Sequence, residues 1–444
     1  MNQPYAPAPE AEPMIRATQG LCQPCGLPRP AELFERDGDV WISVTCPEHG
    51  THEAMYWRDR ALFDRLDDVV GDYRWCTTFE CLKGVQCDRC LEKSYNVMVE
   101  VTNACNLDCP VCCSDANAFV AHRDPTIQEI VGRLPDPGRD RLGRLRRPNI
   151  VLFGGEPTVR KDLPQLIAAL VAKGYIPRVA TNGTRMADEA YVRTLVDAGL
   201  RWVILQTDGF EDGISELLRG EKLVDRKAEA LKVMTRAGIQ VQMGCMLVQD
   251  ANTNQVGDLV RYLVRSDEVF WLSFYPHSAQ SRANLPTPET SVAEALAAIE
   301  RETGGRITAD DFVQTMKLLG GLDRVLKLPN LKQKLSTLPM ILVVDGDDYI
   351  PLVRLLNPRE ALRRPRLLAR IARELPRALR YQEGQAPPFL KFMVVEKFHG
   401  DASIDLEEAA NCHMAFVTAE HFVPFDIYNI AYKHGGRWDR ARTR

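Results

Sequence analysis

Between residues 95 and 282, short β-branched apolar runs alternate with longer segments whose apolar residues recur at helical spacing. Short apolar runs bounded by turn residues are typical of buried strands, and the helical segments between them are typical of crossover connections. The pattern predicts six βα units and a parallel sheet with helices outside it. We expect strands at Tyr95–Thr102, Asn149–Phe153, Ile176–Ala180, Trp202–Gln206, Gln240–Leu247 and Glu268–Phe274, and helices at Asp162–Lys173, Asp188–Ala198, Asp225–Ala237 and Asn254–Val264. The pattern alone does not separate a doubly wound sheet from a barrel.

Polar residues and glycines follow the ends of these strands, where such folds place their active sites. Glycines let a backbone approach a ligand closely, although Asn-Gly and Asp-Gly pairs are also ordinary turns. Arg219 suits a carboxylate partner, with a surface helix position as the alternative. The candidates for a ligand site are Gly154, Gly155, Glu156, Thr158, Asn182, Gln206, Asp208 and Arg219, with Tyr275 and His277, at the rim of the substrate pocket, as the catalytic candidates.

Three cysteines, Cys105, Cys109 and Cys112, follow the first predicted strand at CxxxCxxC spacing. Thiolates are the usual protein ligands of iron–sulfur clusters, and four are normally used. A loop with three can hold a 4Fe–4S cluster and leave one iron open to a small molecule. A structural zinc site would usually pair two CxxC knuckles, and disulfides do not suit a reducing compartment.

The first 92 residues contain a second set of cysteines. Cys22, Cys25 and Cys46 lie on two knuckles around a predicted hairpin, as in a zinc ribbon or rubredoxin site, with Cys76 or His49 as the fourth ligand. Three further thiols can join Cys76 in a second iron–sulfur cluster: Cys81, Cys87 and Cys90. We therefore expect metal here, and the choice between zinc, mononuclear iron and a cluster stays open.

Composition narrows the class of protein. The 444 residues are 45% hydrophobic, enough for two or three domains, and the net charge of −4 argues against a nucleic-acid binder. Eleven of the 13 cysteines precede residue 114, which favours metal over disulfides in a cytoplasmic protein. The sequence shows neither a secretory signal nor an apolar run long enough to span a membrane.

The motif VTNACNLDCPVC, followed about 40 residues later by GGEPT, resembles the radical S-adenosylmethionine (SAM) superfamily. The resemblance implies a partial (β/α)6 barrel in which Cys105, Cys109 and Cys112 hold the catalytic 4Fe–4S cluster. It implies that the Gly154–Glu156 loop binds the methionyl amino group of SAM, and that an electron donor of ferredoxin or flavodoxin type is needed. One electron then cleaves SAM to methionine and a 5′-deoxyadenosyl radical.

The N-terminal CxxC and CPEHG elements make the chain most similar to the tetraether lipid synthase-like group. That group acts on lipid tails, so the resemblance implies an apolar or lipid-like substrate. The C-terminal third departs from the pattern: of the group's later cysteines only Cys412 remains, which implies that this auxiliary cluster is absent.

An arginine-rich segment lies in the C-terminal third, with nine arginines between Arg354 and Arg380 and apolar residues at helical spacing. It reads either as a helix packed on the barrel or as a basic amphipathic helix on anionic lipid, which would allow peripheral membrane contact. We expect four regions: a disordered lead (1–19), a cysteine-rich metal module (20–92), the radical SAM partial barrel (93–285), and a mostly helical substrate and auxiliary region with degenerate cluster ligands (286–444).

These features predict a radical SAM enzyme that modifies an unactivated C–H bond of an apolar, lipid-like substrate by carbon–carbon bond formation or alkylation. One alternative is a radical SAM methylase or cyclase acting on a pterin, a peptide or another small molecule. A non-catalytic iron–sulfur electron carrier is the second alternative, and the Gly154–Glu156 element argues against it.

Overall fold

The computed structural model describes residues 13–71, 96–118, 123–134, 137, 149–280, 282–283, 285, 287–326, 334–379, 389–412, 414–418 and 422–432. The predicted ligands of the second cluster lie outside the described residues: Cys76, Cys81, Cys87 and Cys90. The structure therefore does not describe this cluster. Within the described residues, no helix combines the length and apolar character needed to cross a bilayer.

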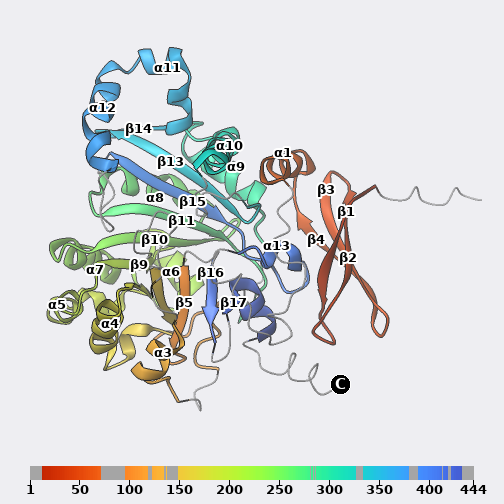
Figure 1. Ribbon diagram of the computed structural model, residues 1–444, viewed down its shortest axis with the longest axis horizontal. Helices are drawn as coiled ribbons and strands as arrows, with labels where there is room; N and C mark the ends of the chain where they lie inside the picture. The colour runs from red at the N-terminus through yellow and green to blue at the C-terminus, as the bar shows by residue number, and fades with distance from the viewer. Residues whose placement is uncertain are drawn as a thin grey trace, which may run out of the picture.

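The N-terminal segment forms a separate antiparallel sheet of four strands in chain order: β1 (Met14–Cys22), β2 (Leu27–Arg36), β3 (Asp39–Cys46) and β4 (Gly50–Trp57). Its central hairpin turns at Asp37 and Gly38, which have φ angles of 53° and 80°. Consecutive positive φ angles suit the two-residue turn between twisted antiparallel strands, and Asp-Gly favours them. Helix α1 (Arg60–Val70) then leads toward the main body, beside which the sheet stands (Figure 1).

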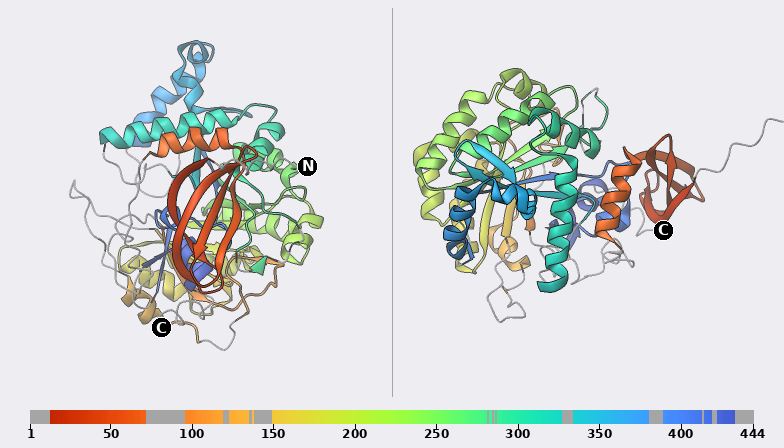
Figure 2. Two further views of the ribbon diagram at one scale, coloured as in Figure 1. Left: turned by 90° about the vertical axis from the view of Figure 1, so that its right-hand side faces the viewer. Right: turned by 90° about the horizontal axis from the view of Figure 1, so that it is seen from above.

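The main body is a curved, mostly parallel sheet covered by helices on its outer side (Figures 1 and 2). The six predicted strands all pair in parallel with their neighbours, and they and the four predicted helices end within two residues of the expected positions. The strands are β5 (Asn96–Thr102), β7 (Asn149–Gly154), β8 (Ile176–Thr181), β9 (Trp202–Gln206), β10 (Gln240–Leu247) and β11 (Val269–Pro276). The helices include α3 (Ile127–Arg133), α4 (Leu163–Ala172), α5 (Glu189–Asp197), α6 (Asp212–Arg219), α7 (Val224–Arg236) and α8 (Val256–Arg265).

The two faces of this sheet bury different apolar clusters. On β7, Ile150 and Leu152 join the large cluster beneath the outer helices, whereas Val151 and Phe153 join a smaller cluster with Phe416 and Phe425 from the C-terminal region. Alternate residues of a strand point to opposite faces, so these strands must be apolar on both. C-terminal side chains therefore fill the inner face of the curved sheet.

The C-terminal third adds strands to both ends of the sheet. The sequence predicts a mostly helical region there and does not predict these strands. The order within the described chain is β14-β13-β15-β11-β10-β9-β8-β7-β5-β16-β17, so the sheet stays open and the barrel is partial, as predicted. The added strands are β13 (Thr337–Asp345), β14 (Asp348–Pro351), β15 (Leu390–Glu396), β16 (Met414–Val417) and β17 (Phe422–Pro424). The helices of this region are α9 (Val292–Glu302), α10 (Ala309–Leu326), α11 (Pro358–Leu362), α12 (Pro365–Leu379), α13 (Leu406–Ala409) and α14 (Phe425–Ile427).

The arginine-rich segment forms α11 and α12, which stand at one end of the molecule, away from the N-terminal sheet (Figure 1). Leu367 of α12 is buried with Val343 and Phe389, and Ile371 packs against the same cluster. The apolar side of this helix is therefore covered in part by the sheet.

Candidate active site and metal centre

The three cysteines of the CxxxCxxC motif lie in the loop after β5, at the carboxyl edge of the sheet. Cys105, Cys109 and Cys112 are each half-buried. The backbone N–H of Leu107 donates to Sγ of Cys105 at 3.4 Å, and that of Ala116 donates to Sγ of Cys112 at 3.5 Å. Such bonds favour the thiolate, which is the form that binds iron.

The electrostatics of this loop fit a bound iron–sulfur cluster. Burial, together with the charges of Glu156, Cys109 and Cys112, raises the pKa of Cys105 to about 11. Adjacent thiolates therefore destabilise one another unless positive iron lies among them. Among the described residues, the three sulfurs belong to no set of ligand atoms within 4.8 Å of one another, the spacing that suits a single ion.

The glycines after β7 let two loops touch. The N–H groups of Gly155 and Glu156 donate to the carbonyls of Thr102 and Ala104 at 2.8 and 2.9 Å. A Cβ on Gly154 would lie 2.2 Å from the carbonyl oxygen of Thr102, and one on Gly155 would lie 2.1 Å from that of Ala104. Only glycine allows this approach, so the pair fixes the backbone immediately before Cys105.

The Glu156 carboxylate is occupied by its own chain. It accepts hydrogen bonds from the N–H and hydroxyl of Thr158, from the hydroxyl of Thr181 at 2.7 Å, and from the N–H of Asn182 at 2.8 Å. Burial raises its pKa, and these bonds oppose that shift. Glu156 therefore joins the ends of β7 and β8. Because its side chain is occupied, the SAM contact expected of this loop stays a proposal, and it would be made by the backbone of the loop.

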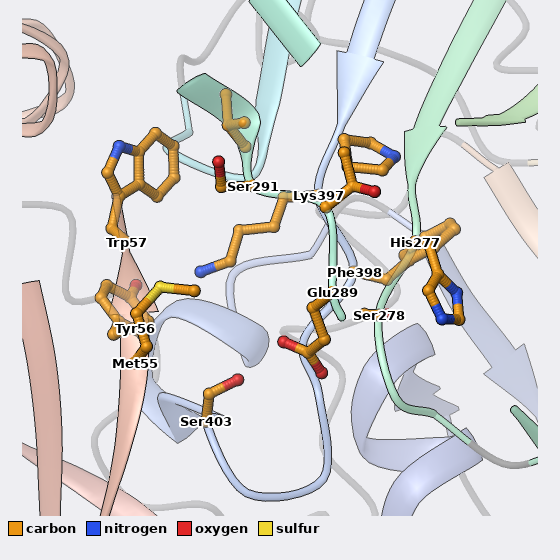
Figure 3. A pocket seen from close by; sticks show the side chains of 13 residues that line it. Met55, Tyr56, Trp57, His277, Ser278, Glu289, Ser291, Lys397, Phe398 and Ser403 are labelled. Carbon is orange, nitrogen blue, oxygen red and sulfur yellow. The ribbon is translucent and has the colours of Figure 1, made fainter. Parts of the chain in front are cut away.

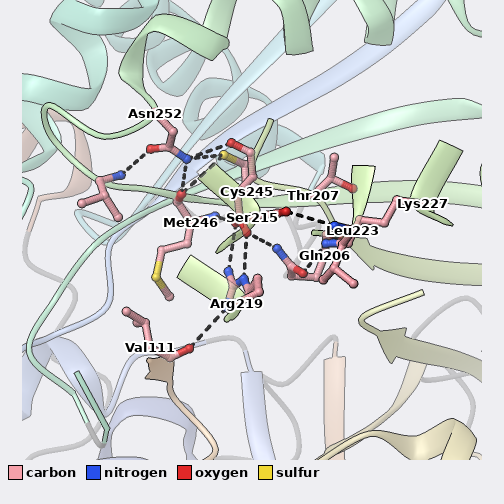
Figure 4. Close-up of polar contacts among 12 residues, drawn as sticks. Val111, Gln206, Thr207, Ser215, Arg219, Leu223, Lys227, Cys245, Met246 and Asn252 are labelled. Carbon is pink, nitrogen blue, oxygen red and sulfur yellow. Dashed lines mark hydrogen bonds and ion pairs between the residues drawn. The ribbon is translucent and has the colours of Figure 1, made fainter. Parts of the chain in front are cut away.

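Arg219 and Asp208 form a buried bidentate ion pair. The guanidinium Nε and Nη2 donate to Asp208 at 2.7 and 2.9 Å, and Nη1 donates to the carbonyl of Val111 at 3.3 Å (Figure 4). Asp208 also accepts from the N–H of Met246 at 3.0 Å, and its pKa is lowered by Arg219 despite burial. Arg219 thus ties the end of β9 to the cysteine loop, and its positive charge faces Cys109 and Cys112.

Two amides connect other strand ends to this assembly. The Asn182 amide donates to Oδ1 of Asn106, inside the cysteine loop, at 2.8 Å. Gln206 accepts from Nζ of Lys227, and its own amide donates to Asp208. The predicted strand-end residues therefore lie together, and many of their polar groups bond one another.

The segment after β11 closes the site from the other side. Arg282 and Ala283 form β12, which pairs with β6 (Val111–Cys112) of the cysteine loop. Arg282 also donates to Asp108 at 2.6 Å. Tyr275 stacks on Phe398 with ring centroids 5.2 Å apart. His277 is buried, burial lowers its pKa, and its Nδ1 has no hydrogen-bond partner among the described residues.

The N-terminal sheet gathers a second, tighter ligand set. Cys22, Cys25, Cys46 and His49 place one ligand atom each within 4.8 Å of one another. His49 Nδ1 lies 3.6 Å from Sγ of Cys22 and 3.4 Å from Sγ of Cys46. Three thiols and an imidazole are a common set for structural zinc. Of the two candidates for the fourth ligand, His49 lies in place, and Cys76 is outside the described residues.

Sequence spacing does not single out Asn106 or Asn117, which shape the cysteine loop. Oδ1 of Asn117 accepts from the N–H of Cys105 at 2.8 Å, and its backbone has a φ of 68°. Asparagine tolerates this left-handed conformation better than most residues. That tolerance is the only signal in the sequence, and it is shared by many turns.

Known proteins share these features. The family model described as "Radical SAM superfamily" matches residues 99–263, and "HMPTM N-terminal zinc ribbon domain" matches residues 14–58. A 7,8-dihydro-6-hydroxymethylpterin dimethyltransferase from Methanocaldococcus jannaschii is 28% identical over 95% of this chain and 89% of its own length. A GTP 3',8-cyclase from Vibrio atlanticus is 26% identical over 40% of this chain and 52% of its own length, so the chain spans about half of that relative.

Among solved structures, Streptococcus suis SuiB bound to the precursor peptide SuiA has a TM-score of 0.39 and 15% identity, covering 48% of this chain and 45% of that one. The radical SAM model covers β5 to α8, the segment that carries the three cysteines and the glycine loop. This chain is therefore a radical SAM enzyme with an N-terminal zinc ribbon, and a 4Fe–4S cluster and SAM are its cofactors.

Proposed function

We propose that this enzyme is a radical SAM methyltransferase acting on a pterin or a closely related small heterocycle. The observation that carries the proposal is the relative named 7,8-dihydro-6-hydroxymethylpterin dimethyltransferase, whose similarity extends over 95% of this chain. The match includes the zinc ribbon, an element that is not part of the radical SAM domain itself. Among the functions weighed from the sequence, the methylase on a small molecule is thereby favoured.

The chain's own residues would bind the cluster and keep water away from the reacting groups. When bound, the cluster and SAM supply the one-electron chemistry that activates a C–H bond. Cys105, Cys109 and Cys112 would ligate three irons. Arg219 would oppose their negative charge from a buried position, since its partner Asp208 fixes its side chain. The aromatic rings of Tyr275 and Phe398 would exclude water from the inner side of the sheet.

Anaerobic assays with reconstituted enzyme, SAM and dithionite test this proposal. We expect 7,8-dihydro-6-hydroxymethylpterin to accelerate formation of 5′-deoxyadenosine, because hydrogen removal from a bound substrate draws SAM cleavage forward. Mass spectrometry of the pterin should show added methyl groups when an extract supplies any further methyl donor and a ferredoxin or flavodoxin supplies electrons. A rate of SAM cleavage that pterins leave unchanged, with no methylated product, would contradict the proposal.

An apolar, lipid-like substrate is the second candidate, supported by the surface around α11 and the start of α12. Leu356 and Leu362 are 62% and 78% exposed, and the neighbouring Arg363 and Arg366 are exposed as well. Exposed leucines beside arginines can bind an anionic bilayer, since each basic residue contributes about 1 kcal/mol near its surface. Leu367 of the adjoining helix α12 is buried against Val343 and Phe389, so α12 does not turn all of its apolar residues to solvent. This weighs against a long membrane-facing helix.

Co-sedimentation with vesicles tests the second candidate. A membrane role predicts salt-sensitive binding to anionic vesicles that Leu362→Ser with Arg366→Glu weakens, with neutral vesicles as the control. Absence of binding to either kind of vesicle would remove the support for a substrate that lies in a bilayer.

A further inference from the structure

A small pocket, partly open to solvent, lies between the N-terminal sheet and the main body. The end of β4 forms one wall with Tyr56 and Trp57. The segments after β11 and β15, with His277 and Lys397, form the others (Figure 3). Of these strands, β11 and β15 end at the carboxyl edge of the main sheet, the edge that also carries the cysteine loop. The ribbon and the barrel therefore build one pocket together.

The Lys397 ammonium contacts aromatic rings in this pocket but has no hydrogen-bond acceptor among the described residues. Its Nζ is shielded from solvent. It lies 3.8 Å from the centroid of the Tyr56 ring and 5.2 Å from that of Trp57. A buried ammonium without an acceptor is unfavourable, and a lysine side chain can rotate to reach one. The position could therefore receive an acceptor that the described residues do not supply.

Nearby acidic groups already have other partners. Glu408 is held by Tyr56 and by His399 at 3.3 Å, and Asp426 is held by His399 at 3.0 Å. Asp405 accepts from Arg16 at 3.2 Å and from Thr18 at 2.6 Å. No ion pair joins Lys397 to a described carboxylate within 4.0 Å, although Oε1 of Glu408 also lacks a hydrogen bond.

Glu289 supplies the complementary group. Its carboxylate lines the same pocket, and its one hydrogen bond within the described residues is from the N–H of Ala279 to Oε1, at 2.7 Å. Figure 3 shows the Glu289 carboxylate and the Lys397 side chain facing one space, with the Ser403 hydroxyl below them. One wall thus offers an anionic acceptor and a cationic donor, which suits a ligand edge carrying both N–H groups and a carbonyl oxygen.

Aromatic rings give the pocket flat walls and connect it to the catalytic end of the sheet. Phe398 lines the pocket and stacks on Tyr275, the residue at the end of β11. Four residues after Ser278, Arg282 pairs with Cys112 of the cysteine loop. The segment that lines the pocket therefore leads along the chain to the strand that pairs with the cysteine loop.

We propose that this pocket binds the polar edge of a flat, nitrogen-rich heterocycle between the ribbon and the barrel. Lys397 donates to the carbonyl oxygen of the ring, and Glu289 accepts from the adjacent N–H groups. This inference rests on the proposed function and deepens it, because it assigns substrate recognition to an interface that needs the zinc ribbon. It makes Lys397 and Glu289 residues that determine substrate specificity.

Fluorescence of Trp57 tests the pocket directly in the cluster-loaded enzyme. The probe is 7,8-dihydro-6-hydroxymethylpterin, and Trp57→Phe identifies the part of the quenching that belongs to the pocket. We expect Glu289→Gln and Lys397→Met each to weaken binding by roughly tenfold or more, since each removes a charge-assisted hydrogen bond. Glu300→Gln and Lys232→Met change exposed residues of the same kinds and should leave the affinity unaltered.

The outcomes separate the pocket from the function. Binding that quenches Trp57 and is lost in both variants supports the inference even if no methylated product forms, a result that would overturn the function alone. A pterin that is methylated without quenching Trp57, or with equal affinity in both variants, overturns the inference and leaves the function standing. No binding and no turnover in the wild type overturn both. Iron content and melting temperature of each variant confirm that the protein is folded.

Discussion

At the scale of single residues, the site depends on backbone groups that lie unusually close. Gly155→Ala would place a Cβ 2.1 Å from the carbonyl oxygen of Ala104, in the loop that carries Cys105. Relieving such a contact usually costs about 1–3 kcal/mol and moves backbone. We expect lower stability and lower iron and sulfide content after reconstitution. Gly213→Ala is the control, because nothing lies within 4 Å of the Cβ it would add.

The buried pair of Arg219 and Asp208 gives a second prediction at this scale. Asp208→Asn leaves a guanidinium that is only 8% exposed without its counter-ion, which typically costs about 3–5 kcal/mol. Urea unfolding should show the loss. The exposed pair of Asp258 and Arg261 is the matched control, because Asp258→Asn should cost less than about 1 kcal/mol. Equal effects at the two positions would show that the buried pair does not support the site.

The cysteines give the third prediction. Replacing Cys105, Cys109 or Cys112 by Ala should abolish reductive SAM cleavage and remove about one cluster per chain, because each supplies a ligand that the loop cannot replace. Cys113→Ala, next to the motif, should keep both the SAM cleavage activity and the cluster. Iron analysis and 5′-deoxyadenosine assays provide the measurement, and wild-type rates in any of the three variants would exclude that cysteine as a ligand.

The sequence predicts which residues gather at the site better than it predicts what they touch. Spacing identifies the three thiols and the glycine pair, because each set lies within one short stretch of sequence. It does not reveal that Arg219 pairs with Asp208, or that Glu156 binds Thr181 and Asn182. Glu156 meets Thr181 and Asn182 because β7 and β8 are paired neighbours. Arg219 meets Asp208 because the end of α6 packs against the end of β9. Neither contact can be read from spacing.

At the scale of elements, periodicity succeeds where a strand is flanked by its own helix. Four of the six predicted strands are followed by a segment with helical periodicity, which makes these βα units recognisable from the sequence. The C-terminal strands lack that context: β16 is four residues long and joins β5, more than 300 residues earlier in the chain. β16 is buried because it pairs with β5, and its four residues are too few to show a recognisable alternation of apolar and polar positions.

The ribbon gives a prediction at the scale of an element. His49→Asn removes one of four ligands, so metal content and melting temperature should both fall, because a structural metal contributes directly to folding free energy. His52→Asn, on β4, lies outside the four-residue ligand set and should retain the metal. Metal analysis and calorimetry make the comparison. Full metal content in the His49 variant would point to a ligand beyond the described residues, such as Cys76.

At the scale of the whole molecule, one buried polar network joins the ribbon to the barrel. Tyr56 at the end of β4 donates to Glu408, His399 bridges Glu408 and Asp426, and Gln280 donates to Asp426 at 3.0 Å. Gln280 precedes the segment that pairs with the cysteine loop. The two sheets are therefore held together by charged groups as well as by apolar contacts. Such a network is stable only while its members keep their protonation states.

His399 makes the stability of this junction depend on pH. Burial and Lys397 lower its pKa, but Asp426 and Glu408 outweigh them and raise the pKa from 6.5 to about 9. A group whose pKa is higher in the folded protein stabilises it fully below its unfolded value. The stabilisation from His399 is therefore complete below about pH 6.5 and is lost as the pH rises through about 9.

Melting curves of wild type and His399→Gln between pH 6 and 10 test this linkage. The variant should melt lower than wild type near neutral pH, because Glu408 and Asp426 lose the cation between them. The difference should shrink as the pH rises, since wild-type His399 then gives up the same charge. His52→Gln should keep the wild-type pH profile. Melting temperatures of wild type and His399→Gln that differ by the same amount at every pH would mean that folding does not raise the pKa of His399, and Glu408 and Asp426 would then not hold it as a cation.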